Sequence, residues 1–256
     1  MPELSAERAN TFIWADLACP DLPAAQRFYG ELFGWSAETS PDPAAGGYGF
    51  FQKQGETVAG YGQAQPGQPT AWSVYVGTED AEATVQKVQS AGGSVVVPPF
   101  DVLDQGRTAV CHDPEGAFFG LWQPIRMAGT DVSGKPGTVC WHELQTRDWR
   151  GAVRFYPQVF GWDHHEGSYG DGVYIEWKRG ESQVGGCFPM PAGVPAEVPA
   201  YWLIYVAVSD CDASSGRVSE LGGQVMVPPT DIPGTGRFAL FQDPQGAACA
   251  VIQLTR

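Results

Sequence analysis

The sequence predicts an α+β protein made of two tandem copies of one domain, with two strand–helix–three-strand modules in each copy. The first observation is a repeat, because "RFYGELFGW" at 27–35 returns as "RFYPQVFGW" at 154–162. The second is a run of matches 130 positions apart, which includes "VPP" at 97–99 and 227–229 and the turns "DPEGA" and "DPQGA". The third is length, since 256 residues suit two domains of ordinary size.

Composition and charge limit the classes of function. Hydrophobic residues make up 43% of the chain and charged residues 17%, with nine Trp and thirteen Phe, which is typical of a globular protein with much aromatic surface. The formal net charge of -14 repels phosphate backbones and anionic lipids, so we expect no nucleic-acid and no membrane partner. The start "MPELSAERANTF" lacks a basic segment followed by an apolar run, which favours a cytoplasmic protein. Six scattered cysteines without a C-x-x-C pair indicate buried free thiols.

The first module, at about 11–64, opens with "TFIWADLAC", which alternates as a strand does. Asp21 is the predicted cap of a helix that Gly34 ends, and short strands follow near 48–52 and 58–63. The apolar residues that predict this helix recur at helical spacing: Leu22, Ala25, Tyr29, Leu32 and Phe33.

The scheme restarts at about 70–123 with the strand "AWSVYV", a helix from the cap Asp80 to about Ala91, and three further strands. The second copy repeats both modules at about 138–190 and 200–254, with caps at Asp148 and Asp210. Pro157 should kink or shorten its first helix. The segment "PIRMAGTDVSGKPG" at 124–137 reads as a linker, which gives domains 1–126 and 127–256.

The motif "D-x(5)-RFY-x(3)-FGW" at 21–35 and 148–162, the "AGG" and "LGG" helix ends and the "DPxGA" turns resemble the vicinal oxygen chelate superfamily. This superfamily includes glyoxalase I, bleomycin-resistance proteins and extradiol dioxygenases. The resemblance covers both halves and implies two glyoxalase-like domains, each an open cupped sheet of two βαβββ modules. The pattern is most similar to tandem-domain actinobacterial proteins labelled hydroxylases or glyoxalase-like proteins.

The resemblance also implies a divalent metal, held in the cup by His, Gln and Glu side chains from four strands. The matching positions of this chain can be listed: Trp14 and Trp141, Gly60 and Gly186, Ser73 and Leu203, and Gly120 and Ala250. None of these residues is a credible metal ligand. We therefore expect no metal and no cofactor.

Strand alternation predicts which other side chains line each cup, because residues two apart share a face. The resulting cup would combine an indole wall, a phenol and one acid, with glycines leaving room for a flat ligand. The candidate catalytic residues are Asp16, Glu143, Tyr75 and Tyr205. The candidate ligand-binding residues are Trp14, Trp141, Ser73, Phe118, Trp122, Gln145, Gly60, Gly120 and Gly186.

Structural interpretations compete with these roles. Trp14 and Trp141 could fill the cup as core packing, and the two acids could lie at a solvated rim or pair with Arg107 and Arg237. His142 follows Trp141, so alternation points it away from the cup and favours a structural role. Similar arguments place His112 in a turn and His164 and His165 in an exposed loop.

Three functions remain open. The first is a metal-free protein that binds a planar aromatic or polyketide-like metabolite. The second is a cofactor-independent enzyme on such a compound, for example an isomerase, a cyclase or a hydroxylation partner, in which Asp16 or Glu143 moves a proton. The third is a metal-dependent lyase or dioxygenase that recruits other ligands, such as Glu143 with His142. Because the chain contains its own domain partner, we expect a monomer, with a homodimer as the alternative.

Overall fold

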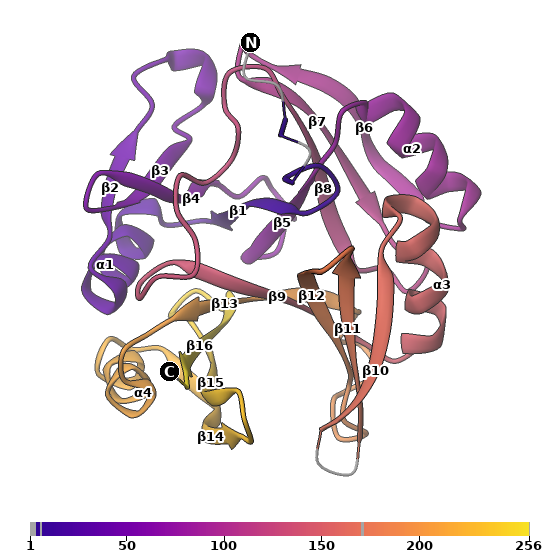
Figure 1. Cartoon of the computed structure of the whole chain (residues 1–256). Helices are drawn as coiled ribbons and strands as arrows, with labels where there is room; N and C mark the ends of the chain where they lie inside the picture. Colours follow the sequence, from indigo (N-terminus) through magenta and orange to yellow (C-terminus); the bar gives the residue numbers. More distant parts are fainter. Residues whose placement is uncertain (1–3, 6, 170–171, 256) are drawn as a thin grey trace. The chain divides into compact units, whose positions relative to one another are not determined.

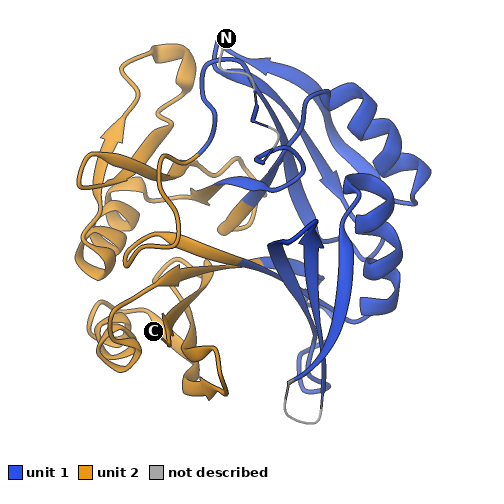
Figure 2. Cartoon of the chain, in the orientation of Figure 1, with its two compact units in different colours: residues 1–14, 74–129, 142–202 blue, residues 15–73, 130–141, 203–256 orange. Residues whose placement is uncertain are grey.

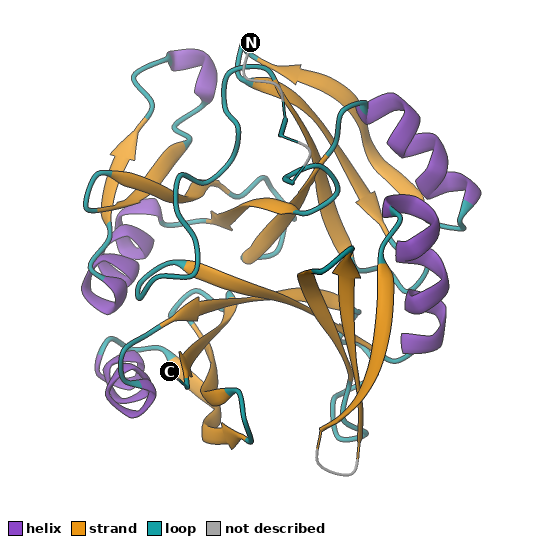
Figure 3. Ribbon diagram, in the orientation of Figure 1, coloured by secondary structure: helices purple, strands orange, loops and turns teal. Residues whose placement is uncertain are grey.

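The computed structural model describes residues 4–5, 7–169 and 172–255. This part of the chain forms sixteen strands and four α-helices (Figure 1 and Figure 3). The first half contains β1 Phe12–Cys19, α1 Leu22–Phe33, β2 Ser36–Thr39, a short 3-10 helix Pro43–Ala45, β3 Gly49–Lys53, β4 Glu56–Gln63, β5 Ala71–Gly77, α2 Ala81–Ser90, β6 Ser94–Val102, β7 Gly106–His112 and β8 Phe118–Pro124. The second half contains β9 Val139–Thr146, α3 Trp149–Phe160, β10 Asp163–Tyr169, β11 Gly172–Arg179, β12 Ser182–Pro189, β13 Tyr201–Ala207, α4 Cys211–Glu220, β14 Gln224–Ile232, β15 Gly236–Gln242 and β16 Ala248–Leu254.

The predicted α+β class and module order are confirmed, because every module contains one strand, one helix and then three strands. Two strands, β2 and β10, were not located by the hydrophobic pattern, and His164 and His165, which were expected in an exposed loop, lie on β10. All four residues of β2 are exposed, so no buried face marks this strand in the sequence.

Each half of the sequence forms one open, mixed eight-stranded sheet. The strand orders are β2-β3-β4-β1-β5-β8-β7-β6 and β10-β11-β12-β9-β13-β16-β15-β14. Inside each sheet, the first strand of a module pairs in parallel with the last strand of the same module, as β1 does with β4 and β9 with β12. This register places Asp16 opposite Gly60 and Glu143 opposite Gly186.

The chain also divides into two compact units, each of which takes segments from both halves (Figure 2). Unit 1 comprises 1–14, 74–129 and 142–202, and unit 2 comprises 15–73, 130–141 and 203–256. Helices α2 and α3 pack together in unit 1, and helices α1 and α4 do so in unit 2. Each sheet is formed by one half of the sequence, whereas each compact unit combines segments of both halves. The domain limits 1–126 and 127–256 therefore stay a prediction.

A buried chain of hydrogen bonds connects two modules in unit 1. The indole Nε1 of Trp202 donates to the hydroxyl of Tyr156 at 3.0 Å, and this hydroxyl donates to Asp113 Oδ2 at 3.0 Å. Asp113 Oδ1 accepts the backbone N–H groups of Glu115 and Ala117 in the "DPEGA" turn. Burial, and then the charge of Asp113, raise the pKa of Tyr156 well above its ordinary value, so its hydroxyl stays a donor.

Unit 2 repeats this arrangement with residues of its own. Trp72 Nε1 donates to the Tyr29 hydroxyl at 2.9 Å, which donates to Asp243 Oδ2 at 3.0 Å. Asp243 Oδ1 accepts the N–H groups of Gln245 and Ala247. The two repeated motifs "RFY" and "DPxGA" therefore meet, because the tyrosine of one holds the aspartate of the other.

The tryptophan of each "FGW" motif holds an irregular segment. Trp35 Nε1 donates to the carbonyl of Gly137 in the linker at 2.6 Å, and Trp162 Nε1 donates to the carbonyl of Asn10 at 2.6 Å. Both indoles are buried, so each of these bonds satisfies a donor that water cannot reach.

The predicted helix signals are confirmed. The carboxylates of Asp21, Asp80, Asp148 and Asp210 each accept a backbone N–H three residues later. Gly34 and Gly161 end their helices in the left-handed conformation, both with φ of 69°.

Pro157 does not shorten its helix, because α3 and α1 both contain twelve residues, while a kink at this residue stays a prediction. Proline removes one backbone donor. The apolar face of α3 is buried on both sides of Pro157, by Phe155 and Tyr156 before it and by Val159 and Phe160 after it, and this packing keeps the helix intact.

His142 has the structural role that alternation predicts. Its ring stacks on Phe12, with 4.3 Å between ring centroids and 21° between planes. Burial lowers the pKa of His142 to about 3, so the imidazole is neutral near pH 7. All six cysteines are free, and all but Cys140 are buried, as predicted.

None of the helices in the described part of the chain combines the length and the apolarity that a membrane span requires.

We predict that Tyr156→Phe lowers the free energy of unfolding by about 1–3 kcal/mol, because it leaves the buried N–H of Trp202 and one oxygen of Asp113 without their partner. Urea unfolding measures the change, and Tyr29→Phe provides the matched variant in unit 2. In the double variant Tyr156→Phe/Asp113→Asn, the losses should not add. An unchanged unfolding midpoint would contradict the assigned role.

We predict that His142 makes the protein less stable as the pH falls below about 6.5. The unfolded chain then takes up a proton at this residue, while the folded chain does so only near pH 3. Replacing it, in His142→Phe, should reduce the slope of unfolding free energy against pH by up to about 1.4 kcal/mol per pH unit between pH 6.5 and 5. The exposed His164→Gln is the control, and equal slopes in all three proteins would show the prediction to be wrong.

Candidate functional site

The positions that match the family's metal ligands lie on the predicted strands: Trp14 on β1, Gly60 on β4, Ser73 on β5, Gly120 on β8, Trp141 on β9, Gly186 on β12, Leu203 on β13 and Ala250 on β16. An indole has no free lone pair for a metal, and Gly, Ala and Leu have no donor side chain, which leaves one serine hydroxyl. Among the described residues, no group of three or more His, Cys, Asp or Glu side chains is arranged to hold a metal ion. This donor set does not fit the divalent ion that the resemblance implies.

A carboxylate with two hydrogen-bond donors lies on the face where these positions occur. In unit 1, the Tyr174 hydroxyl donates to Glu143 Oε2 at 2.9 Å and Gln145 Nε2 donates to Oε1 at 2.6 Å. Glu143 is only 7% exposed. Parallel register places Gly186 beside Glu143 and Phe188 beside Gln145.

Tyr201, the first residue of β13, belongs to the same group, because β13 lies next to β9, the strand of Glu143 and Gln145, in the sheet. It lies two residues before Leu203 and therefore shares a strand face with it. Burial, and then the charge of Glu143, raise the pKa of the Tyr201 phenol, which keeps it protonated near pH 7. We call Glu143, Gln145, Tyr174 and Tyr201 the Glu143 cluster.

Unit 2 contains the equivalent acid with a tyrosine. The Tyr48 hydroxyl donates to Asp16 Oδ2 at 3.1 Å, and Asp16 lies opposite Gly60 in the parallel register. We call Asp16 and Tyr48 the Asp16 pair. The two copies of the repeat thus each combine an acid with a phenol.

The space above Gly120 is filled by a side chain of the protein. Gly120 is the register partner of Tyr75, and a Cβ atom on this glycine would overlap the tyrosine ring. The glycine therefore makes room for Tyr75 at this point, where the sequence interpretation expected room for a ligand. The equivalent Tyr205 lies opposite Ala250 and is buried.

The two aromatic residues expected beside Gly120 have partners in unit 1. The Phe118 ring contacts the His112 ring, with 5.9 Å between centroids. Trp122 Nε1 donates to the carbonyl of Met127 at 2.8 Å, and the indole is buried. Both contacts support packing.

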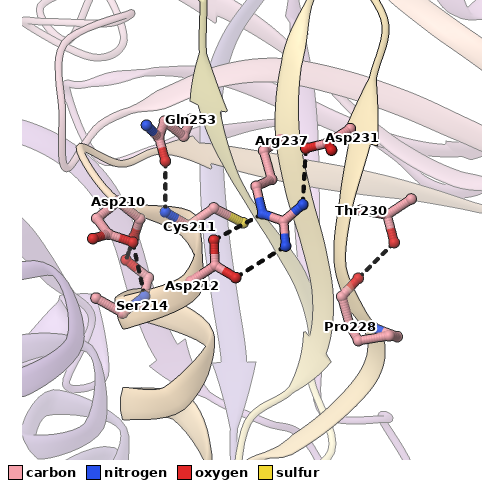
Figure 4. Close-up of polar contacts among 10 residues, drawn as sticks. Asp210, Cys211, Asp212, Ser214, Pro228, Thr230, Asp231, Arg237 and Gln253 are labelled. Carbon is pink, nitrogen blue, oxygen red and sulfur yellow. Dashed lines mark hydrogen bonds and ion pairs between the residues drawn. The ribbon is translucent and has the colours of Figure 1, made fainter.

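The alternative pairing of the two acids with Arg107 and Arg237 is wrong. Arg107 forms ion pairs with Glu82 and Asp101. Figure 4 shows Arg237 between Asp212 and Asp231, with N–O distances of 2.7 and 2.8 Å. Each arginine thus binds two carboxylates of its own helix–strand module.

Sequence reasoning missed the three tyrosines of these groups, Tyr48, Tyr174 and Tyr201. Two of them, Tyr48 and Tyr174, occupy equivalent positions in the repeat. Tyr48 lies two residues before Phe50, which pairs with Gly60. Tyr174 lies two residues before Glu176, which pairs with the equivalent Gly186. Changes in loop length between the copies hide this equivalence in a simple alignment. Tyr201 has no counterpart, since alanine occupies the matching position 71.

Trp14 is buried and Trp141 is partly exposed, and Ser73 is buried. The roles of these three residues in ligand binding, and those of the other residues predicted from the sequence, stay predictions.

Curated relatives cover almost the whole chain. The chain is 40% identical over 261 aligned residues to "Putative glyoxylase CFP32" of Mycobacterium tuberculosis, which covers 99% of this chain and 98% of the relative. It is 41% identical over 257 residues to "Anthracycline biosynthesis protein DnrV" of Streptomyces peucetius, which covers 94% of this chain and 92% of the relative.

Solved structures share the fold at low identity. The Mn(II)-bound glyoxalase from Novosphingobium aromaticivorans superposes with a TM-score of 0.66 at 18% identity, covering 96% of this chain and 82% of that one. The 2,3-dioxygenase LapB from Pseudomonas sp. KL28 superposes with a TM-score of 0.65 at 14% identity, covering 97% and 94%. These similarities show the fold alone.

A family model supplies the assignment. The model described as Glyoxalase/Bleomycin resistance protein/Dioxygenase superfamily matches residues 11–121 and 138–251, which include both copies of the repeat. The chain therefore belongs to the glyoxalase/bleomycin resistance protein/dioxygenase superfamily.

Proposed function

We propose that this protein binds a small, planar aromatic metabolite of the polyketide type without a bound metal. The observation that carries this proposal is the Glu143 cluster, in which a buried carboxylate is surrounded by phenol and amide groups on the strand face where the family resemblance implies a metal. Hydroxyl, amide and carboxylate groups match the carbonyl and hydroxyl groups of an oxygen-rich aromatic compound.

The donor set supports binding without a metal. Glycine, alanine, leucine and tryptophan at seven of the eight family positions supply no ligand atoms, and the eighth is Ser73. The ligand would then be recognised by organic functional groups of the protein, through hydrogen bonds and apolar contact.

The class of ligand is supported by two relatives. The chain is about 40% identical to proteins named for anthracycline biosynthesis, DnrV of Streptomyces peucetius at 41% and DauV of Streptomyces sp. (strain C5) at 39%. Anthracyclines are flat, fused aromatic ring systems that present carbonyl and hydroxyl oxygens. Aromatic rings of this kind pack well on Trp, Tyr and Phe side chains.

A second candidate function, a cofactor-independent enzyme, is favoured by the contact between Tyr174 and Glu143. A carboxylate held by a phenol can accept a proton from a substrate, and a tyrosine hydroxyl can polarise a carbonyl. In this proposal Asp16 or Glu143 moves the proton and Tyr75 or Tyr205 polarises the carbonyl.

We predict that an anthracycline or a hydroxyanthraquinone quenches the fluorescence of the nine tryptophans in a saturable way. Dialysis against EDTA should leave the affinity unchanged. The substitution Glu143→Gln should weaken binding about tenfold or more, because a hydrogen bond to a charged group is lost. The exposed Glu181→Gln is the matched control. Loss of binding after EDTA with recovery on adding a metal ion would contradict the proposal.

Chromatography of the same mixtures separates binding from turnover. Recovery of the unchanged compound supports the binding protein. A new product formed by the wild type and absent with Glu143→Gln, with binding retained, would favour the enzyme.

A further inference from the structure

The two copies of the repeat differ around their acids. Gln145 and Tyr201 belong to the Glu143 cluster, and the equivalent residues near Asp16 are Ala18 and Ala71, at the repeat offsets of 127 and 130. Ala18 and Ala71 cannot donate or accept a side-chain hydrogen bond. The chain therefore concentrates polar recognition groups in one copy.

Two atoms of the Glu143 cluster, Gln145 Oε1 and the Tyr201 hydroxyl oxygen, have no hydrogen-bond partner among the residues that the structure describes. The amide of Gln145 points its Nε2 at Glu143, since a carboxylate only accepts, and no residue in the described ranges donates to the remaining Oε1. The Tyr201 hydroxyl likewise forms no hydrogen bond with another residue that the structure describes. Both side chains are partly buried, so a ligand that pairs with these atoms would replace water with a matched partner.

The chemistry of the two atoms is complementary. The Tyr201 hydroxyl is a donor, and the raised pKa of its phenol keeps it protonated near neutral pH. The Gln145 Oε1 is an acceptor. A ligand that satisfies both presents an acceptor, such as a carbonyl oxygen, to the tyrosine and a donor, such as a hydroxyl group, to the glutamine.

We infer that the protein binds one ligand molecule per chain, at the Glu143 cluster, and that Tyr201 and Gln145 select an aromatic ketone or quinone that carries a free phenolic hydroxyl. This inference rests on the proposed function and adds its stoichiometry and its specificity-determining residues. The Asp16 pair also combines an acid with a phenol, but it lacks counterparts of Gln145 and Tyr201, which would form hydrogen bonds with the ligand.

The test compares anthraquinone with 2-hydroxyanthraquinone by isothermal titration, at a pH where the phenol is protonated. Position 2 lies away from the ring carbonyls, so its hydroxyl is free to donate to the protein. We expect a stoichiometry of one, and tighter binding of the hydroxylated compound by about two- to tenfold, the range of a neutral hydrogen bond. Gln145→Ala should bring this ratio close to one. Tyr201→Phe should weaken both compounds by a similar factor and leave their ratio unchanged.

The variants are chosen so that folding is retained, because the other copy of the repeat carries alanine at the position of Gln145. The exposed Gln86→Ala on α2 is the control and should keep the wild-type ratio. A stoichiometry of two, or a ratio that survives Gln145→Ala, would overturn this inference while the proposed function stands. Failure of the wild type to bind either compound would overturn the proposed function, and this inference with it.

Discussion

The fold depends on a buried tyrosine that donates to a buried aspartate. In each unit the tyrosine comes from the "RFY" motif of one module and the aspartate from the "DPxGA" turn of another, with an indole N–H completing the chain. Buried polar groups that lose a partner cost about 1–3 kcal/mol each, so this contact selects one pairing of modules over others. The aspartate caps and the glycines at the helix ends fix where each helix begins and ends. The hydrogen bonds of Tyr29 and Tyr156 connect each helix to a particular "DPxGA" turn.

Duplication supplied two equivalent acids, and the residues around them then diverged. The acid–phenol contact is retained in both copies, as Tyr48 with Asp16 and Tyr174 with Glu143. The surroundings differ in polarity, with a glutamine and a second tyrosine on one side and alanines on the other. The strand face on which the family resemblance implies a metal thus carries organic hydrogen-bonding groups in this chain.

Much of the architecture could be predicted from the sequence, because its signals are local. The four aspartate caps, the two left-handed glycine stops and the alternation of buried strands each depend on a few neighbouring residues. Strand β2 could not be predicted because it has no buried face. The effect of Pro157 on helix length was predicted wrongly because packing on both sides of this residue stabilises the helix. The grouping of side chains in the candidate site was predicted only in part. Alternation identified Asp16, Glu143 and Gln145, but the tyrosines that bind the two acids lie on other strands, and the ring over Gly120 depends on register between strands.

The composition of the compact units bears on how the gene could be divided. Each unit combines modules from both halves, so a break in the linker would leave Tyr29 and Asp243 on separate polypeptides, and would do the same to Tyr156 and Asp113. Neither fragment could complete these contacts within itself. Because both copies lie in one chain, these contacts form within a single molecule and do not depend on protein concentration, as an association between two molecules would.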